Sequence, residues 1–150
     1  LDDVTVEVIA DGKHLPASLL KLIYKCKGAD GMALCSDALS AAGMPEGSYS
    51  IGGRDDRRIL VEEGVAWLPD KSAFAGSVVT GSQLIKTMVD LAGVPIQEAV
   101  KMATITPARI LKVDDRMGSL DRGKYADIAV LSDDFSVLRT IVGGKTVYEA

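Results

Sequence analysis

Hydrophobic and polar positions in the first part of the chain follow two different periods. In VTVEVIA (4–10) valines alternate with other residues, which predicts a β-strand. PASLLKLIYKCK (16–27) instead has the spacing of a helix, with a proline suited to its first turn, and the apolar run MALCS (32–36) after GADG predicts a second, buried strand. The apolar residues expected on one face of that helix are Leu19, Leu20, Ile23 and Tyr24. The order strand, helix, strand favours parallel strands joined by a crossover helix.

The pattern changes after residue 45. SYSIGG, RRILVEE and VAWLP are short β-like segments between glycine-rich or charged turns, and they predict a small antiparallel excursion at about residues 46–69. Helical patterns return in GSQLIKTMVDLAG, PIQEAVKMA and TPARILK. The first of these has a single apolar face, formed by Leu84, Ile85, Met88, Val89 and Ala92. The end of the chain is β again, and Gly143–Gly144 between the last two predicted strands is a hairpin signal.

Composition limits the classes of protein to consider. The chain has 150 residues, of which 47% are hydrophobic, enough for the core of about one domain. Its net charge is −4 and its basic residues are interspersed with acidic ones, so we expect no nucleic-acid partner. No apolar run approaches the roughly 20 residues of a membrane span and no signal peptide is recognisable, which predicts a cytoplasmic protein without membrane contact. The start at Leu1, with a strand pattern already under way, predicts a piece of a longer protein.

Candidate functional residues lie where the two predicted N-terminal strands end. His14, the single histidine, follows the first strand beside an acid and a glycine, and Asp37 follows the second. Each residue also has an ordinary interpretation, since a lone histidine is often a hydrogen-bonded surface residue and an aspartate after a strand is often a cap or turn residue. Together with Cys26 and Cys35 they could form a zinc site, but the cysteine spacing does not match paired ligands and we expect both thiols to be buried.

Two further stretches have structural interpretations. The serine in AGSVVTG, Ser77, lacks the Gly-x-Ser-x-Gly spacing of a nucleophile elbow. RDDRR, residues 54–58, has mixed charge between short strands, which favours a solvated turn over a phosphate site.

Five stretches occur together in a recognisable order. They are ADGKHL (10–15), CSDAL (35–39), AFAGS (73–77), ATITPARIL (103–111) and GSLDRGKYADIAVL (118–131). In this order and approximate spacing the chain resembles the C-terminal part of the N-acetylglucosamine-6-phosphate deacetylases, a family of the amidohydrolase superfamily. TPA and the Gly-Ala-Asp type of tail are widespread among metal-dependent amidohydrolases, whereas ADGKH together with SDA and AGS is similar to the sugar deacetylase branch.

The resemblance implies an α/β fold with a metal-dependent-hydrolase β/α barrel and a small β-sandwich. Residues 1–112 would form the C-terminal part of the barrel, including its last two strands, the β excursion and the following helices, and residues 113–150 would form sandwich strands. Because active sites of such barrels lie at the strand ends, His14 and Asp37 would leave the last two strands at the same catalytic rim.

The implied activity is hydrolysis of the N-acetyl amide of N-acetylglucosamine 6-phosphate by a metal-activated water, giving glucosamine 6-phosphate and acetate in amino-sugar catabolism. By resemblance Asp37 would activate the water and then protonate the sugar nitrogen, and His14 would contact the sugar. The loop around Phe74, Ala75 and Gly76 resembles the segment that packs beside the acetyl group, with Ala73, Phe74 and Ala75 as substrate-binding residues. Lys13 and Phe74 stand where the family often has aliphatic residues.

The resemblance also implies a divalent metal, zinc or similar, whose ligands come from earlier strands. A catalytic zinc site usually takes three protein ligands, and this chain has one histidine, which the family uses for substrate. We therefore assign no metal ligand within this chain and expect the fragment alone to be inactive. The expected partners are a small amino-sugar phosphate and further copies of the same chain in a homo-oligomer.

Two alternatives stay open. One is another amidohydrolase, a cyclic amidase or deaminase, because TPA and the tail motif are shared with such enzymes. The other is a non-catalytic folding or dimerisation module. In the tail motif Asp127 is interpreted as structural, ordering the turn into a strand.

Overall fold

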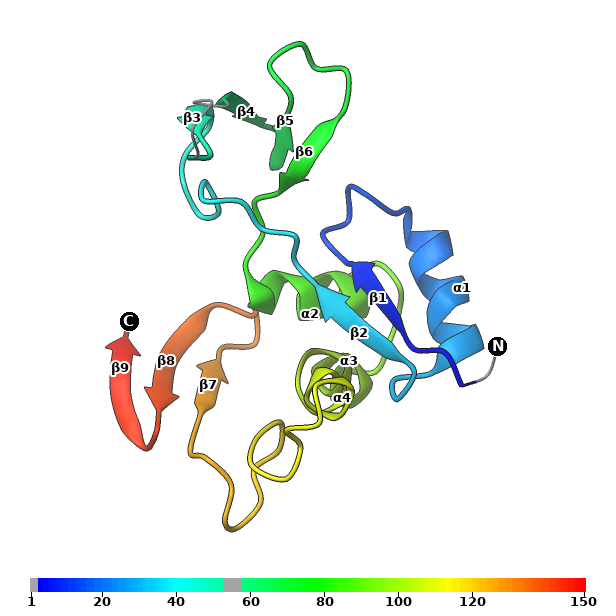
Figure 1. Cartoon of the computed structure of the whole chain (residues 1–150), viewed down its shortest axis with the longest axis vertical. Coiled ribbons are helices and arrows are strands. Elements are labelled where there is room, and N and C mark those ends of the chain that lie inside the picture. Colours follow the sequence, from blue (N-terminus) through cyan, green and yellow to red (C-terminus); the bar gives the residue numbers. More distant parts are fainter. Residues whose placement is uncertain (1–2, 53–57) are drawn as a thin grey trace.

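A computed structural model describes residues 3–52 and 58–150, and Figure 1 shows three separate sheets with helices beside the first. The first sheet pairs β1 (Val6–Ile9) with β2 (Met32–Cys35) in parallel, and α1 (Ala17–Lys27) connects them. The predicted order strand, helix, strand is therefore confirmed, and the chain has an α/β fold.

Helix α1 packs through only part of its predicted apolar face. Leu20 is fully buried and Ile23 and Tyr24 pack against the core, but Leu19 is exposed. Cys26 is also exposed and Cys35 is half-buried, so the prediction of two buried thiols is wrong for Cys26. With 3.6 residues per turn, Cys26 lies about 120° around the helix from Leu20, outside the face that contacts the sheet.

The main core lies between the β1–β2 sheet and the helices that follow the second sheet. These are α2 (Gly81–Asp90), α3 (Ile96–Ala103) and α4 (Ile105–Ile110). The predicted face of α2 and the segment after it is confirmed, because its apolar residues are buried or pack against the core: Leu84, Ile85, Met88, Val89 and Ala92. Through this stripe α2 packs on β2 and α3, which helps to hold the β1–β2 sheet in place.

The second sheet is an antiparallel meander with its own small core. Its strands are β3 (Gly47–Ser50), β4 (Arg58–Glu62), β5 (Val65–Trp67) and β6 (Phe74–Ser77). Ala41, Ile59, Val61 and Ala66 are buried within it. Residues 74–76, predicted from the sequence to lie in a loop, belong to the fourth strand of this sheet. Most of RDDRR, residues 54–57, lies outside the described residues.

The third sheet is formed by β7 (Ile128–Leu131), β8 (Val137–Val142) and β9 (Lys145–Glu149), all antiparallel. The predicted hairpin is present, with both Gly143 and Gly144 at positive φ (55° and 78°). The N–H of Gly143 donates to Oδ1 of Asp127 at 2.7 Å, and the N–H of Gly144 donates to the carbonyl of Ala126 at 3.0 Å. Asp127 thus ties the start of β7 to the hairpin, which is a structural role.

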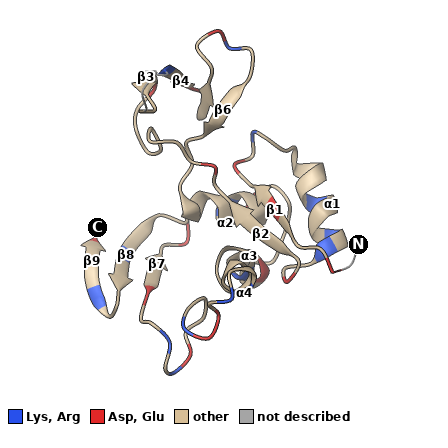
Figure 2. Cartoon of the chain, viewed as in Figure 1, with Lys and Arg blue, Asp and Glu red and all other residues tan. Residues whose placement is uncertain are grey.

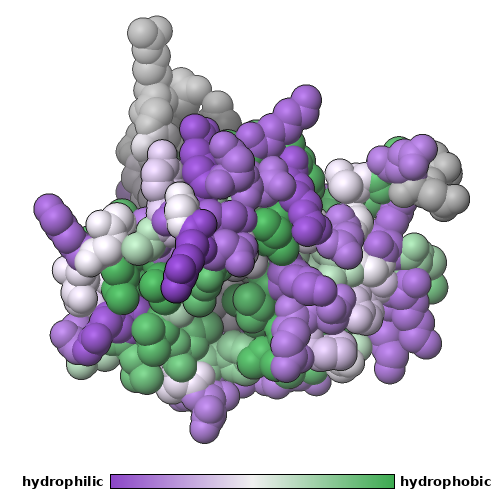
Figure 3. Space-filling view, turned by 90° about the horizontal axis from the view of Figure 1, so that it is seen from below, coloured by the Kyte–Doolittle hydropathy of each residue, from purple (hydrophilic) through white to green (hydrophobic). Residues whose placement is uncertain are grey.

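Charged residues are spread over all parts of the chain, with both signs interspersed (Figure 2). Apolar side chains gather on the face seen from below in Figure 3. A cavity of about 760 Å³ runs between α3, α4 and β7, lined among others by Ile105, Leu111 and Tyr125.

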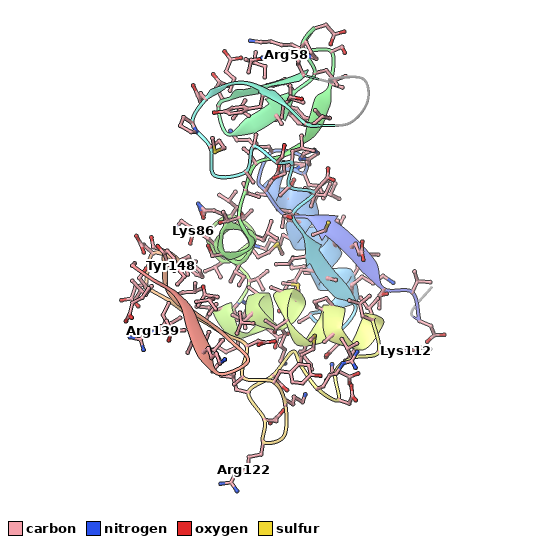
Figure 4. The ribbon with its side chains drawn as sticks, turned by 60° about the vertical axis from the view of Figure 1, so that its left-hand side comes forward. Arg58, Lys86, Lys112, Arg122, Arg139 and Tyr148 are labelled. Atoms are coloured by element: carbon pink, nitrogen blue, oxygen red, sulfur yellow. The ribbon has the colours of Figure 1, made fainter. Side chains whose placement is uncertain are left out.

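In Figure 4, Arg58, Lys112 and Arg122 point outward at three different ends of the molecule. Within the described residues no helix is long and apolar enough to cross a membrane.

The TPA motif has a structural explanation in a buried hydrogen bond. Oγ1 of Thr106, in α4, donates to the carbonyl of Ala29 at 2.7 Å, and both residues are buried. This bond ties α4 to the turn that precedes β2. Thr106 therefore helps to position the strand that carries Asp37.

We expect Thr106→Val to lower the free energy of unfolding by about 1–3 kcal/mol, because it leaves the buried carbonyl of Ala29 without a donor. The midpoint of urea unfolding measures this loss. Thr104→Val is the matched control, because the hydroxyl of Thr104 donates to the carbonyl of Val100 on the exposed side of the helix. An equal loss in both variants would contradict a special role for Thr106.

Candidate active site

The two candidate functional residues, His14 and Asp37, follow strands that end at the same edge of the first sheet. Strands β1 and β2 pair in parallel from Val6 opposite Met32 to Ile9 opposite Cys35, so their carboxyl ends meet (Figure 1). His14 follows β1 after a short turn, and Asp37 follows β2 almost at once. Edges of this kind are where α/β proteins place their ligands.

The turn after β1 is organised around a buried carboxylate. Oδ1 of Asp11 accepts hydrogen bonds from the N–H groups of Lys13 and His14, each at 2.9 Å. Oδ2 of Asp11 lies 2.7 Å from Nδ1 of His14. Gly12 has φ +76°, and a Cβ there would lie 3.2 Å from the side chain of Leu91. The turn therefore needs a glycine at position 12 and an acceptor side chain at position 11.

The charge of Asp11 follows from these contacts. Burial on its own would raise the pKa of Asp11, but the backbone N–H groups of His14 and Lys13 and the imidazole outweigh it, and the pKa is lowered from its ordinary value of 3.8. The carboxylate is ionised near neutral pH and can only accept, so Nδ1 of His14 carries the proton that they share. The role of Asp11 is not among the features predicted from the sequence, although an aspartate three residues before a histidine in a turn is a usable signal.

Aromatic contacts join this turn to the second sheet. The rings of His14 and Phe74 meet edge to face with centroids 5.1 Å apart, and Phe74 contacts Trp67 in the same way at 4.5 Å. The structure thus brings His14 and Phe74 together. Ala75 instead packs against the small core of the second sheet, and Ala73 lies just before β6 with its carbonyl accepting from the N–H of Leu68.

Asp37 has an unusual backbone conformation, with φ +48°. Its carbonyl accepts a hydrogen bond from the N–H of Ser77 at 2.8 Å, and the N–H of Leu39 donates to the carbonyl of Ser77 at 2.9 Å. The side chain of Asp37 is exposed at the strand end. The end of β6 therefore fixes the backbone from the carbonyl of Asp37 to the N–H of Leu39.

Gly76 allows this close approach. Its φ is +147°, and a Cβ at this position would lie 3.0 Å from Cγ of Leu39 and 3.1 Å from the carbonyl oxygen of Asp37. CSDAL and AFAGS, far apart in the sequence, are therefore in direct backbone contact. Ser77 is fully buried and its Oγ accepts from the N–H of Val79 at 3.1 Å, which is a structural role and not that of a nucleophile.

We tested whether the side chains present fit a metal ion. Among residues 3–52 and 58–150, no three histidine, cysteine, aspartate or glutamate side chains lie close enough together to hold one. The group of Cys26, Cys35, His14 and Asp37 considered above is therefore not a zinc site. Within the described residues these donors do not fit a catalytic metal by themselves.

Comparison with known proteins identifies the family. The family model described as "Amidohydrolase family" matches residues 1–147. The chain belongs to the amidohydrolase family. The sequence-based recognition is confirmed, because this amidohydrolase is similar throughout its length to N-acetylglucosamine-6-phosphate deacetylases.

Two curated relatives illustrate the similarity. The N-acetylglucosamine-6-phosphate deacetylase of Vibrio furnissii is 37% identical over 145 residues, which are 97% of this chain and 35% of the relative. A putative N-acetylgalactosamine-6-phosphate deacetylase of Escherichia coli K12 is 34% identical over 140 residues, which are 93% of this chain and 81% of that relative. The chain thus spans about a third of the first relative and most of the second.

Solved structures give the same result. The N-acetylglucosamine-6-phosphate deacetylase of Thermotoga maritima matches with a TM-score of 0.87 at 37% identity, covering 100% of this chain and 40% of that one. The Mycobacterium smegmatis enzyme matches with a TM-score of 0.88 at 32% identity, covering 98% of this chain and 38% of that one. The latter is an aspartate-to-alanine variant in complex with N-acetyl-D-glucosamine 6-phosphate.

Proposed function

We propose that this amidohydrolase chain is the C-terminal part of an enzyme that hydrolyses the N-acetyl amide of N-acetylglucosamine 6-phosphate to glucosamine 6-phosphate and acetate. One observation carries the proposal: the contact of CSDAL with AFAGS, which fixes the backbone of Asp37 at the edge from which His14 also emerges. The names of the relatives and solved structures above support the substrate class.

We also propose how the described sheets contribute to such an enzyme. In this proposal β1 and β2 are the last two strands of a β/α barrel, the meander interrupts the barrel after β2, and residues 1–112 belong to the barrel. Residues 113–150 contribute β7, β8 and β9 to a small β-sandwich. The parallel pairing of β1 with β2 supports this, because barrel strands are parallel.

The reaction requires one proton to move twice. Water attacks the amide carbonyl, the new C–O bond forms, and the carboxylate of Asp37 accepts a proton from that water. The C–N bond then breaks, and Asp37 delivers the proton to the leaving sugar nitrogen. An exposed carboxylate whose backbone carbonyl is held by the N–H of Ser77 is suited to this transfer, because general acid–base catalysis depends on placement.

His14 contributes to binding in this proposal. With Nδ1 held by Asp11, Nε2 is the ring nitrogen left to contact a sugar hydroxyl. Phe74 lies beside the imidazole and, in this proposal, forms part of the same substrate-binding surface. Ala73 and Ala75 are its neighbours in the sequence. The divalent metal implied by the resemblance is proposed to be held by residues other than those described, as is the sugar phosphate.

An assay of the complete enzyme tests the proposal. It should release acetate from N-acetylglucosamine 6-phosphate, and the galactosamine epimer belongs in the same assay because two relatives carry that name. Cyclic amides and aminopurines test the alternative amidohydrolase activities. Turnover of a cyclic amide without turnover of either sugar phosphate would overturn the proposal, and no turnover of any of them would favour a non-catalytic module.

We expect His14→Ala in the complete enzyme to lower kcat/KM for the sugar phosphate about tenfold, the value of roughly one hydrogen bond to substrate. The content of bound metal should stay unchanged, because His14 contacts sugar in this proposal. Steady-state kinetics and metal analysis measure the two properties. Loss of metal in the variant would instead make His14 a metal ligand.

A further inference from the structure

Building on the proposed function, we propose that Asp11 is a positioning residue that holds the imidazole of His14 with Nε2 toward the substrate. Asp11 itself does not touch the substrate, because its side chain is only 1% exposed, compared with 20% for His14. Asp11 therefore acts on the reaction indirectly, and two of its three hydrogen bonds go to His14.

The contacts of Asp11 use both oxygens for one purpose. Oδ1 fixes the backbone of residues 13 and 14, and Oδ2 fixes the ring through Nδ1 at 2.7 Å. A single buried side chain thus determines where the Cα of His14 lies and how its ring is turned. A carboxylate is well suited because it accepts all three hydrogen bonds.

Phe74 restrains the ring from a second direction. Its ring meets the imidazole at an interplanar angle of 65°, and it is supported from behind by Trp67. The hydrogen bond to Asp11 fixes one end of the imidazole, and the aromatic contact limits rotation about the ring axis. The two restraints come from different sheets, so the second sheet also contributes to the orientation of His14.

The carboxylate also selects the tautomer. Because an ionised carboxylate only accepts, Nδ1 of His14 donates to Asp11, and in the neutral ring Nε2 then accepts from a hydroxyl of the substrate. Asparagine at position 11 could keep its oxygen on the two backbone N–H groups while its NH₂ group faces His14. The ring would then accept at Nδ1 and carry its proton on Nε2, which reverses the hydrogen bond offered to the substrate.

The test is a double-mutant cycle in the complete enzyme. We expect Asp11→Asn to lower kcat/KM about tenfold, and we expect no further loss when it is added to His14→Ala. Effects that multiply would show that Asp11 acts independently of His14 and would overturn the proposal. The proposal would also be overturned if either single variant had the kcat/KM of the parent.

Asp70→Asn is the matched control. Asp70 also accepts from a backbone N–H two residues on, at Ser72, but in an exposed loop between β5 and β6. The Asp70→Asn variant should have the kcat/KM of the parent. If Asp11→Asn fails to fold, the cycle is repeated with Asp11→Ser, which retains a smaller acceptor for the backbone N–H groups.

Nitrogen-15 NMR of the imidazole gives a readout that is independent of activity. The complete enzyme is measured, and the ring signals of His14 are those absent from the spectrum of His14→Ala. We expect the Nδ1–H tautomer in the parent and the Nε2–H tautomer in Asp11→Asn. A parent ring protonated only at Nε2 would overturn the proposal. If the complete enzyme is inactive on both sugar phosphates, the proposed function fails while this measurement still decides the pairing of Asp11 with His14.

Discussion

Replacing Asp37 by asparagine in the complete enzyme should lower kcat for sugar-phosphate deacetylation by about 10²–10⁴-fold, the usual cost of losing a general acid–base group. Asparagine keeps the size of the side chain and tolerates the positive φ at this position, but it cannot take a proton from water. Substrate binding should largely survive. Steady-state kinetics gives kcat, and titration of the inactive variant with N-acetylglucosamine 6-phosphate gives the affinity.

Asp127→Asn is the control for Asp37→Asn, because Asp127 has a structural role. The amide oxygen of asparagine can still accept the hydrogen bond from the N–H of Gly143, so kcat should equal that of the parent. A kcat for Asp37→Asn within a few-fold of the parent would remove Asp37 from the mechanism. A large loss in both variants would point to a general disturbance of the fold.

Local pattern was sufficient to predict the elements whose partners are close in sequence. The strands β1 and β2 with the helix between them, the apolar face of α2 and the hairpin at Gly143–Gly144 all follow from residue spacing and turn chemistry. These features depend on neighbouring residues, and their placement follows from burying one face of each element.

Features that depend on distant contacts could not be predicted in this way. β6 contains small residues without an alternating pattern, and it is a strand because it pairs with β5. The exposure of Cys26 depends on which face of α1 meets the sheet. The joining of Asp37 to Ser77 and of His14 to Phe74 requires the meander to fold back on the first sheet. The roles of Asp37, His14 and residues 73–75 came from motif resemblance, and they stay predictions until the variants are measured.

The motifs acquire a physical meaning once these contacts are known. ADGKH is a turn in which the aspartate and the glycine both serve the placement of His14. AFAGS is the strand end whose backbone holds Asp37, and the threonine of TPA supports the turn before β2. Two of these motifs thus act at the strand ends from which the candidate residues emerge, and the third acts at the opposite end of β2.

Gly76→Ala should lower both stability and activity, because it disturbs the contact that holds Asp37. The φ of +147° alone costs an alanine about 1–3 kcal/mol. Its Cβ would also lie 3.1 Å from the carbonyl oxygen of Asp37, and a backbone oxygen cannot move aside without moving its residue. Since a displacement of about 1 Å of a catalytic group can reduce the rate about 100-fold, we expect kcat to fall by about that factor.

Gly64→Ala distinguishes this displacement from simple strain. Gly64 has φ +73° in the turn between β4 and β5, but a Cβ there would meet nothing within 4 Å. It should therefore lose stability and keep the kcat of the folded enzyme, whereas Gly76→Ala loses both. Kinetics below the unfolding temperature of each variant, together with thermal unfolding, separates the two effects. If Gly76→Ala were destabilised yet fully active, the end of β6 would support the fold without positioning Asp37.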